Sequence, residues 1–281
     1  MKEPGDAVDS RIWHELDYLR ELGWEELYPA VPPSAPPRTV AREGSGDPPR
    51  SASAVDSGAA HEKPRAMPAA TPEDAAPAEA GGTTREESDE RTRRIAACAS
   101  LDELGELAAG CVACPLAQTR RSVVFGSGSP TAELMFVGEG PGAQEDLKGL
   151  PFVGPAGELL TKIIEAIDLE RGQVYIANVV KCRPPNNRDP QPGEVSACIG
   201  FLRRQVELVQ PKLIVALGRV AAQNLLETDA PVGRMRGRWH SFAGVSLRVT
   251  YHPAALLRNQ SLKRPTWEDM QEVRDRLQAT E

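Results

Sequence analysis

The sequence lacks any apolar run long enough to cross a membrane. A membrane-spanning helix needs about 18 or more consecutive apolar residues, and no such stretch occurs in the 281 residues. The segment that follows Met1 is acidic and has no apolar core, which excludes a secretory signal there. We therefore expect a cytoplasmic protein, in the bacterial cytosol or nucleoid, with no membrane contact.

Cysteine is scarce as well, with five residues in the chain. In a cytosolic protein, cysteines are more often metal ligands or free thiols than disulfide partners. Cys111 and Cys114 form a C-x₂-C pair, Cys182 and Cys198 follow much later, and Cys98 is left over. Four thiolates can hold zinc or a [4Fe–4S] cluster, and the wide second spacing leans toward iron–sulfur. Zinc and unligated buried thiols remain open at this point.

Charge is unevenly distributed along the chain. Residues 1–92 contain 10 Lys and Arg against 19 Asp and Glu, a net charge of −9, whereas residues 93–281 carry a net charge of +2. The acidity of the protein therefore belongs to its front segment. A nearly neutral domain can still bind nucleic acid if its positive side chains gather on one face.

The front segment divides into a short amphipathic helix within residues 1–29 and a linker over residues 30–92. Ser10 is a suitable N-cap, and Gly23 a suitable stop. A helix of this length is marginal alone, so residues 10–28 either dock on their own domain or bind a protein partner. The linker is rich in Pro, Ala, Gly, Ser and acidic residues, which predicts disorder. One helical face carries Ile12, Leu16, Leu19 and Leu22.

The folded domain is expected over residues 93–281, as strands that alternate with helices. Such alternation predicts an α/β fold with a parallel sheet covered on both faces. The apolar runs predict strands over 134–137, 174–180, 213–217 and 247–251, with a further short strand at 122–125. Helical spacing predicts helices over 92–99, 101–109, 158–169, 192–209, 219–226 and 266–278.

Two glycine-rich turns follow the first long strand. They occupy residues 138–142 and 149–157, directly before a predicted helix. In open α/β sheets, ligands bind at the carboxyl ends of strands, where glycine lets the backbone come close to a ligand. Glu139, Glu145 and Asp146 add carboxylates to the same region. The alternative is a tight turn with solvated acids, because short glycine motifs often occur without a ligand.

Three other segments, together with the glycine-rich turns, form a recognisable set. They are Cys111-Val-Ala-Cys114, the stretch YIANVVKCRPPNNR over 175–188 and YHPAALLR over 251–258. The set resembles the iron–sulfur uracil-DNA glycosylases, known as family 4, over about residues 95–278. The resemblance implies a three-layer α/β/α domain with a central parallel four-stranded sheet. It also implies that the protein flips uracil out of DNA and hydrolyses its N-glycosidic bond, leaving an abasic site, in base-excision repair.

The resemblance also implies roles for residues that bind the base. Asn178 would bind the uracil edge, since an amide both donates and accepts hydrogen bonds. Phe152 would stack on the base, and Gly140 would offer a backbone N–H. His252 would stabilise the negative charge that develops on a uracil oxygen.

The residue that positions the attacking water is left open by the sequence. Glu139 and Glu145 are both candidates, with Asn187 supporting the site. A related glycosylase family carries an Asp where this chain has Gly140, so that carboxylate is missing here.

Cys111, Cys114, Cys182 and Cys198 resemble the family's ligands to a [4Fe–4S] cluster. The resemblance therefore implies this cofactor, with a structural function, because base excision needs no electron transfer. Cys98 is expected to have no ligand role.

The expected partner is uracil-containing DNA, bound by a monomer. Arg183, Arg188 and Arg258 are candidates for phosphate contacts around the site. Leu256 or Leu257 is the candidate for a wedge that fills the gap left by the flipped base.

Two other functions are compatible with parts of the sequence. One is a relative that binds uracil-DNA or traps it covalently without turnover. Such a trapping relative carries an added basic loop with a histidine, whereas only His240 and His252 lie in the expected folded domain. The other is a polymerase-associated accessory domain, which would leave Asn178 and His252 unexplained.

Overall fold

The computed structural model describes residues 85–279 of the chain. The helix predicted within residues 10–28, and most of the predicted linker, lie outside the described residues. Within residues 85–279, no helix is both long enough and apolar enough to span a bilayer.

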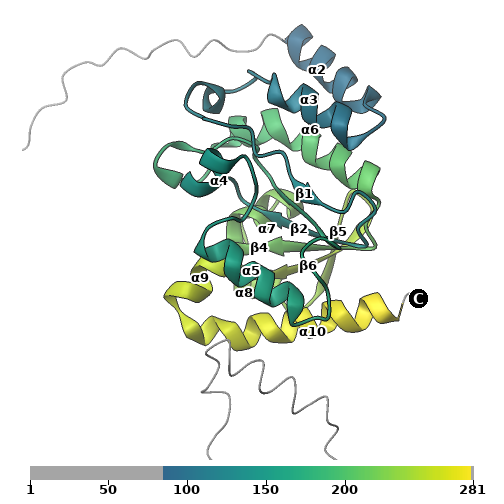
Figure 1. Ribbon diagram of the computed structural model, residues 1–281, viewed down its shortest axis with the longest axis vertical. Coiled ribbons are helices and arrows are strands. Elements are labelled where there is room, and N and C mark those ends of the chain that lie inside the picture. Colours follow the sequence, from purple (N-terminus) through teal and green to yellow (C-terminus); the bar gives the residue numbers. More distant parts are fainter. Residues whose placement is uncertain (1–84, 280–281) are drawn as a thin grey trace, which may run out of the picture. The chain divides into compact units, whose positions relative to one another are not determined.

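A single mixed sheet forms the centre of the described domain (Figure 1). Its strand order is β1-β3-β2-β4-β6-β5, and the inner four strands β3, β2, β4 and β6 pair in parallel. The predicted central four-stranded parallel sheet is thus confirmed. The strands are β1 (Ser127–Gly128), β2 (Leu134–Gly138), β3 (Tyr175–Asn178), β4 (Leu213–Leu217), β5 (Trp239–Phe242) and β6 (Val245–Thr250).

The edges of the sheet differ from the prediction. Residues 122–125 are not a strand, and the short β1 pairs antiparallel with β3 instead. The antiparallel edge strand β5 was not predicted, and it is joined to β6 by a tight turn at Ala243–Gly244. Edge strands are half-solvated, so β5 lacks the continuous apolar run that marks the inner strands.

Helices surround the sheet. The helix predicted over 158–169 lies at 155–165 instead, and those predicted over 219–226 and 266–278 begin one and three residues earlier. The helices over 101–109 and 192–209 are as predicted, whereas the short α4, α8 and α9 were not predicted. The helices are α2 (Arg85–Ala97), α3 (Leu101–Ala109), α4 (Ala143–Lys148), α5 (Pro155–Glu165), α6 (Pro192–Val209), α7 (Gly218–Leu226), α8 (Val232–Met235), α9 (Pro253–Arg258) and α10 (Lys263–Gln278). Single 3₁₀ turns occur at η2 (Pro115–Gln118), η3 (Pro185–Asn187) and η4 (Gln260–Leu262).

The sheet separates two apolar cores, which makes the domain three-layered. In β2, Met135 and Val137 pack in the core with α3, α6 and α7, while Leu134 and Phe136 face the core with α5, α9 and α10. In Figure 1, α3 and α6 lie on one side of the strands, and α5 and α10 lie on the other. Side chains of a strand alternate between its faces, so a strand that is apolar throughout must be covered on both.

The domain begins earlier than predicted. Helix α2 starts at Arg85, so residues 85–92 are helical rather than part of the predicted linker. Ile95 is the buried residue of α2 in the described structure, and it joins the core shared with α6. Because most of the helix is solvated, its composition resembles that of the linker before it, which hid the boundary.

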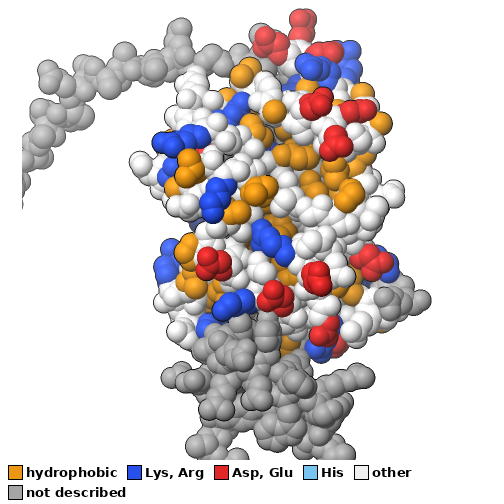
Figure 2. All heavy atoms as spheres, viewed as in Figure 1, with side chains coloured by type: hydrophobic (Ala, Val, Ile, Leu, Met, Phe, Trp, Pro, Cys, Tyr) orange, Lys and Arg blue, Asp and Glu red, His pale blue; other side chains and the backbone are white. Residues whose placement is uncertain are grey.

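Charged side chains of both signs are interspersed over the face seen in Figure 2. This distribution agrees with the small net charge of residues 93–281. On this face, binding of a polyanion therefore depends on particular Lys and Arg side chains rather than on a broad positive surface.

A buried ionic cluster holds α10 against β6, near the end of β6 that precedes His252. The Asp269 carboxylate accepts hydrogen bonds from Arg248 (3.1 Å), Arg236 (2.9 Å) and the Thr250 hydroxyl (2.9 Å). Thr250 is the last residue of β6, and His252 follows two residues later. The cluster therefore fixes the end of β6 from which His252 extends.

Candidate functional site

The carboxyl ends of β2, β3 and β6 border a cavity of about 380 Å³. Sequence positions more than 100 residues apart meet there, because parallel strands end at the same edge of a sheet. The lining includes every residue predicted for catalysis or substrate binding, namely Glu139, Gly140, Glu145, Phe152, Asn178, Asn187 and His252.

Asn178 ends β3 and is 2% exposed. Its side-chain oxygen is buried and has no hydrogen-bond partner among the described residues. Leaving a buried amide oxygen unpaired is unfavourable, so a ligand with an N–H or O–H donor would bind there.

Gly138 makes room for both Asn178 and Phe152. A Cβ at this position would lie 2.4 Å from the Asn178 side-chain oxygen and 2.7 Å from the Phe152 ring. The ring and the amide can therefore border the same cavity only because residue 138 has no side chain.

Phe152 is held in a left-handed conformation, with φ of 53°. The Arg171 guanidinium donates to the carbonyls of Pro151 (2.8 Å) and Phe152 (3.0 Å). On the other side, a Cβ at Gly157 would lie 1.9 Å from the Phe152 carbonyl oxygen, so α5 packs directly on this peptide. Arg171 was not identified from the sequence, because it lies outside the motifs.

His252 is a neutral donor at physiological pH. Its Nδ1 accepts a hydrogen bond from the Ala254 N–H (3.1 Å), which leaves the ring proton of the neutral form on Nε2. Burial, with a smaller contribution from Arg258, lowers the pKa of His252 to about 4, against an opposing contribution from Glu145. Its ring stacks with Phe152 at a centroid distance of 5.5 Å.

The two candidate glutamates have different environments. Glu145 accepts three backbone hydrogen bonds, from Gly142 (3.1 Å), Val153 (3.0 Å) and Gly154 (3.2 Å). It therefore ties the two glycine-rich turns together, and its carboxylate is occupied.

Glu139 has no such hydrogen bonds among the described residues. Burial raises its pKa to about 7, with a further contribution from Asp189 and an opposing one from Arg219. A carboxyl group that titrates near neutral pH is suited to accept a proton. Of the two glutamates, Glu139 is the one free to act on a bound molecule.

The rim of the cavity is basic. Arg188 and Arg258 line it, and Asn187 is oriented by a hydrogen bond from Arg183 Nε (2.8 Å). Arg188 also makes a bidentate ion pair with Glu194 (2.7 and 2.8 Å), which fixes its position.

One residue predicted to contact DNA is wrongly placed by the sequence. Leu256 is fully buried, in the core beneath α9, and cannot reach a duplex. Leu257, the next residue along α9, is 52% exposed. The sequence could not separate them, because that requires knowing which face of α9 packs on α5.

The four predicted ligand cysteines line a second, smaller cavity, together with Arg120 and Lys181. Two of their sulfurs accept hydrogen bonds, Cys198 from the Lys181 N–H (3.3 Å) and Cys182 from Arg120 (3.3 Å). Cys98 is not among the residues that line this cavity. The cysteines are Cys111, Cys114, Cys182 and Cys198.

The four cysteines bring an all-sulfur donor set to one place in the fold, the kind of set that both zinc and iron–sulfur clusters take. Burial raises the pKa of Cys114 and Cys182, and that of Cys198 to about 12, so binding of a metal must displace the thiol protons. In residues 85–279, no three Cys, His, Asp or Glu side chains converge as one metal ion requires.

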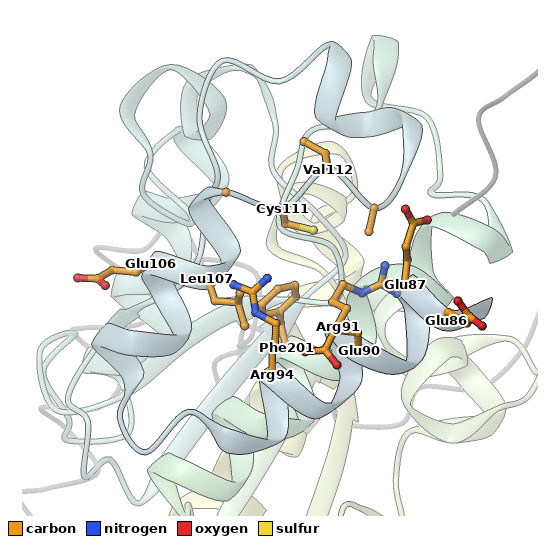
Figure 3. Close-up of a pocket in the computed structure, with 12 residues that line it drawn as sticks. Glu86, Glu87, Glu90, Arg91, Arg94, Glu106, Leu107, Cys111, Val112 and Phe201 are labelled. Atoms are coloured by element: carbon orange, nitrogen blue, oxygen red, sulfur yellow. The ribbon is translucent and has the colours of Figure 1, made fainter. Parts of the chain in front are cut away.

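A larger cavity, about 740 Å³, lies elsewhere, between α2, α3 and residues 110–113 (Figure 3). Charged side chains from α2 surround it, and Phe201 and Leu107 supply apolar walls. It contains none of the predicted catalytic or substrate-binding residues, and Cys111 is its single predicted ligand. Size alone therefore does not identify the reactive site.

Comparison with known proteins gives a consistent family. The sequence model of the "Uracil DNA glycosylase superfamily" matches residues 125–272. The "Type-4 uracil-DNA glycosylase" of Sulfurisphaera tokodaii is 44% identical over 185 residues, which cover 63% of this chain and 84% of the relative. The protein of the same name from Archaeoglobus fulgidus is 44% identical over 182 residues, covering 62% and 92%. That from Thermotoga maritima is 43% identical over 180 residues, covering 62% and 93%.

The pKa of His252 provides a direct test of the geometry. Phe152→Ala should raise it from about 4 toward the ordinary value of about 6.5, because removal of the stacked ring admits water that solvates the imidazolium. An NMR titration of the imidazole from about pH 3 to about pH 8 measures the shift in pKa. Leu257→Ala, an exposed change on the same helix, should leave the pKa unchanged. An equal pKa in the wild type and Phe152→Ala would mean that Phe152 does not shield the ring.

Proposed function

Because the chain belongs to the uracil-DNA glycosylase superfamily, we propose that its 380 Å³ cavity receives a uracil flipped out of DNA. The protein is a hydrolase of N-glycosyl bonds that excises uracil in DNA repair. The observation that best supports the placement of the reaction is the unpaired Asn178 amide oxygen, beside a neutral His252.

Asn178 and Phe152 select and hold the base. The Asn178 oxygen accepts from the N3–H of uracil, and its amide N–H donates to the neighbouring carbonyl oxygen of the base. Cytosine has no N3–H and carries an amine at the next position, so it offers the opposite pattern. The Phe152 ring stacks on the flipped base, as proteins that bind extruded bases commonly do.

His252 acts on the leaving group. As the N-glycosidic bond breaks, negative charge develops on the uracil oxygens, and the Nε2–H of His252 donates to one of them. A neutral donor in a largely buried site stabilises this charge more than it stabilises uncharged uracil, which is the condition for catalysis. The Gly140 backbone N–H adds a second donor at the same edge of the cavity.

Glu139 positions the water that attacks the sugar and accepts a proton from it. This assignment follows from the occupied carboxylate of Glu145 and the near-neutral pKa of Glu139. Asn187 supports the site from η3, and Arg183, Arg188 and Arg258 bind the DNA backbone around the cavity. Leu257 occupies the gap that the base leaves in the duplex.

The four cysteines hold a [4Fe–4S] cluster. An all-sulfur donor set supports this assignment, as do the cationic Arg120 and Lys181 beside it, since thiolates bound to the cluster bring negative charge. The cluster would stabilise the fold and take no part in the hydrolysis, because hydrolysis requires no electron transfer. It ties the 111–114 turn, the segment after β3 and helix α6 together.

The activity is tested with an oligonucleotide that contains one uracil. The wild type should release uracil with turnover, and His252→Ala should lower the single-turnover rate by about 10²–10³ with little change in DNA affinity. His240→Ala is the matched control, because this histidine bonds to the Met235 carbonyl and lies outside the cavity. A covalent adduct on a denaturing gel without turnover would favour the trapping alternative instead.

The role of Glu139 predicts a pH profile. A general base must be deprotonated, and the pKa of Glu139 is about 7, so kcat/KM should fall about tenfold per pH unit below 7 and level off above it. Glu139→Gln should abolish this dependence and lower the plateau. If Glu139→Gln keeps both the plateau and the profile, the water is positioned by another group.

The cofactor proposal predicts about four iron atoms per chain and a brown protein. Cys98→Ser should keep the metal, whereas Cys182→Ser should lose it, as measured by elemental analysis and visible absorbance. One zinc per chain and no iron would refute the assignment.

A further inference from the structure

Lys181 lines the four-cysteine site and is bonded to Asn178, which lines the 380 Å³ cavity. Its ammonium donates to the backbone carbonyl of Asn178 (2.8 Å), and its backbone N–H donates to Cys198 Sγ (3.3 Å). Its covalent neighbour is Cys182. The residue therefore joins the end of β3 to helix α6, on which Cys198 lies.

A second hydrogen bond of the same ammonium strengthens this link. Lys181 Nζ donates to the side-chain oxygen of Gln205 on α6 (2.6 Å). The Gln205 amide nitrogen in turn donates to the Phe125 carbonyl (2.9 Å) and the Tyr175 hydroxyl (3.1 Å). Tyr175 begins β3 and Asn178 ends it, so both ends of this strand are connected to α6.

The charge of Lys181 fits an occupied cysteine site. The side chain is 2% exposed, and no carboxylate of residues 85–279 forms an ion pair with it. A buried ammonium without an anionic partner is costly. Two neutral oxygens, the Asn178 carbonyl and the Gln205 side-chain oxygen, accept its hydrogen bonds, while its own backbone N–H donates to Cys198 of the cysteine site.

We propose that Lys181 is a positioning residue that sets the orientation of Asn178 from the occupied cysteine site. The proposal rests on the base-binding role proposed above for Asn178. The Lys181 ammonium binds the Asn178 carbonyl and is itself held by α6 through Gln205. A shift of α6 would therefore move the backbone of Asn178 and change the orientation of its side-chain amide. Bonds to a charged donor are short and strong, and displacements of about 1 Å in a reactive site can cost about 10² in rate.

The test compares Lys181→Met with the wild type and with Lys212→Met. Methionine keeps the unbranched apolar stem and removes the ammonium, while Lys212 pairs with Glu133 on the surface and serves as the matched control. Lys181→Met should keep its iron and lose about 10–100-fold in single-turnover uracil excision. It should also bind an oligonucleotide with an uncleavable uracil analogue more weakly. Lys212→Met should match the wild type in all three measurements.

A double-mutant cycle with Asn178→Ala identifies the route of the effect. If Lys181 acts through Asn178, then Lys181→Met should change the rate little once the Asn178 amide is gone. Gln205→Met, which releases Lys181 from α6 without altering Asn178 or a cysteine, should show the same non-additivity. This second variant decides the matter if Lys181→Met does not fold.

Three results would each overturn this proposal without touching the base-binding role of Asn178: a wild-type rate for Lys181→Met, a fully additive cycle, or loss of iron in proportion to the loss of rate. A wild-type rate for Asn178→Ala is different, because it would refute base binding by Asn178 and this proposal with it.

Discussion

Two backbone hydrogen bonds just beyond the sheet organise the reactive end of this domain. The Val179 N–H donates to the Gly138 carbonyl (2.9 Å), and the Val180 N–H donates to the Glu139 carbonyl (3.1 Å). They extend the parallel pairing of β2 and β3 past the last strand residues and hold the loop that carries Glu139 beside Asn178. Phe152 and His252 come from other elements and close the cavity over this pair. Without these two hydrogen bonds, the loops after β2 and β3 would not be held together beyond the strands, and the positions of Glu139 and Asn178 in the cavity wall would not be fixed.

The segment after β3 performs several functions within a few residues. Asn178 faces the base cavity, Lys181 turns inward to α6, Cys182 faces the cysteine site, and Asn187 and Arg188 return to the cavity rim. The cofactor site and the reactive site are therefore neighbours along the chain as well as in space. A group held by the four cysteines would therefore act on the cavity at Asn178 through this segment, which lines both sites.

The sequence predicted the buried framework better than the details of the site. The inner strands and α6 have strong apolar patterns, and the strand over 213–217 has the predicted bounds. The elements β5 and α9, with 4 and 6 residues, are too short for a periodic pattern to be detected. The distinction between Glu139 and Glu145 depends on backbone N–H groups from distant turns, which no local pattern reveals. Nothing in the local sequence marks the role of Lys181, because its acceptor on Gln205 lies 24 positions away.

The cavity also depends on two positions that have no side chain. Gly138 and Gly157 make close approaches, the first to Phe152 and Asn178 and the second to the Phe152 carbonyl. Neither glycine offers a side chain to a ligand, yet a methyl group added at either position would collide with Phe152, and at Gly138 also with Asn178, both of which line the cavity. Tolerance to substitution in this protein should therefore be poorly related to polarity or charge. The least tolerant positions include two whose contribution is empty volume, and an Ala at Gly138 would be expected to harm the cavity more than the loss of many surface charges.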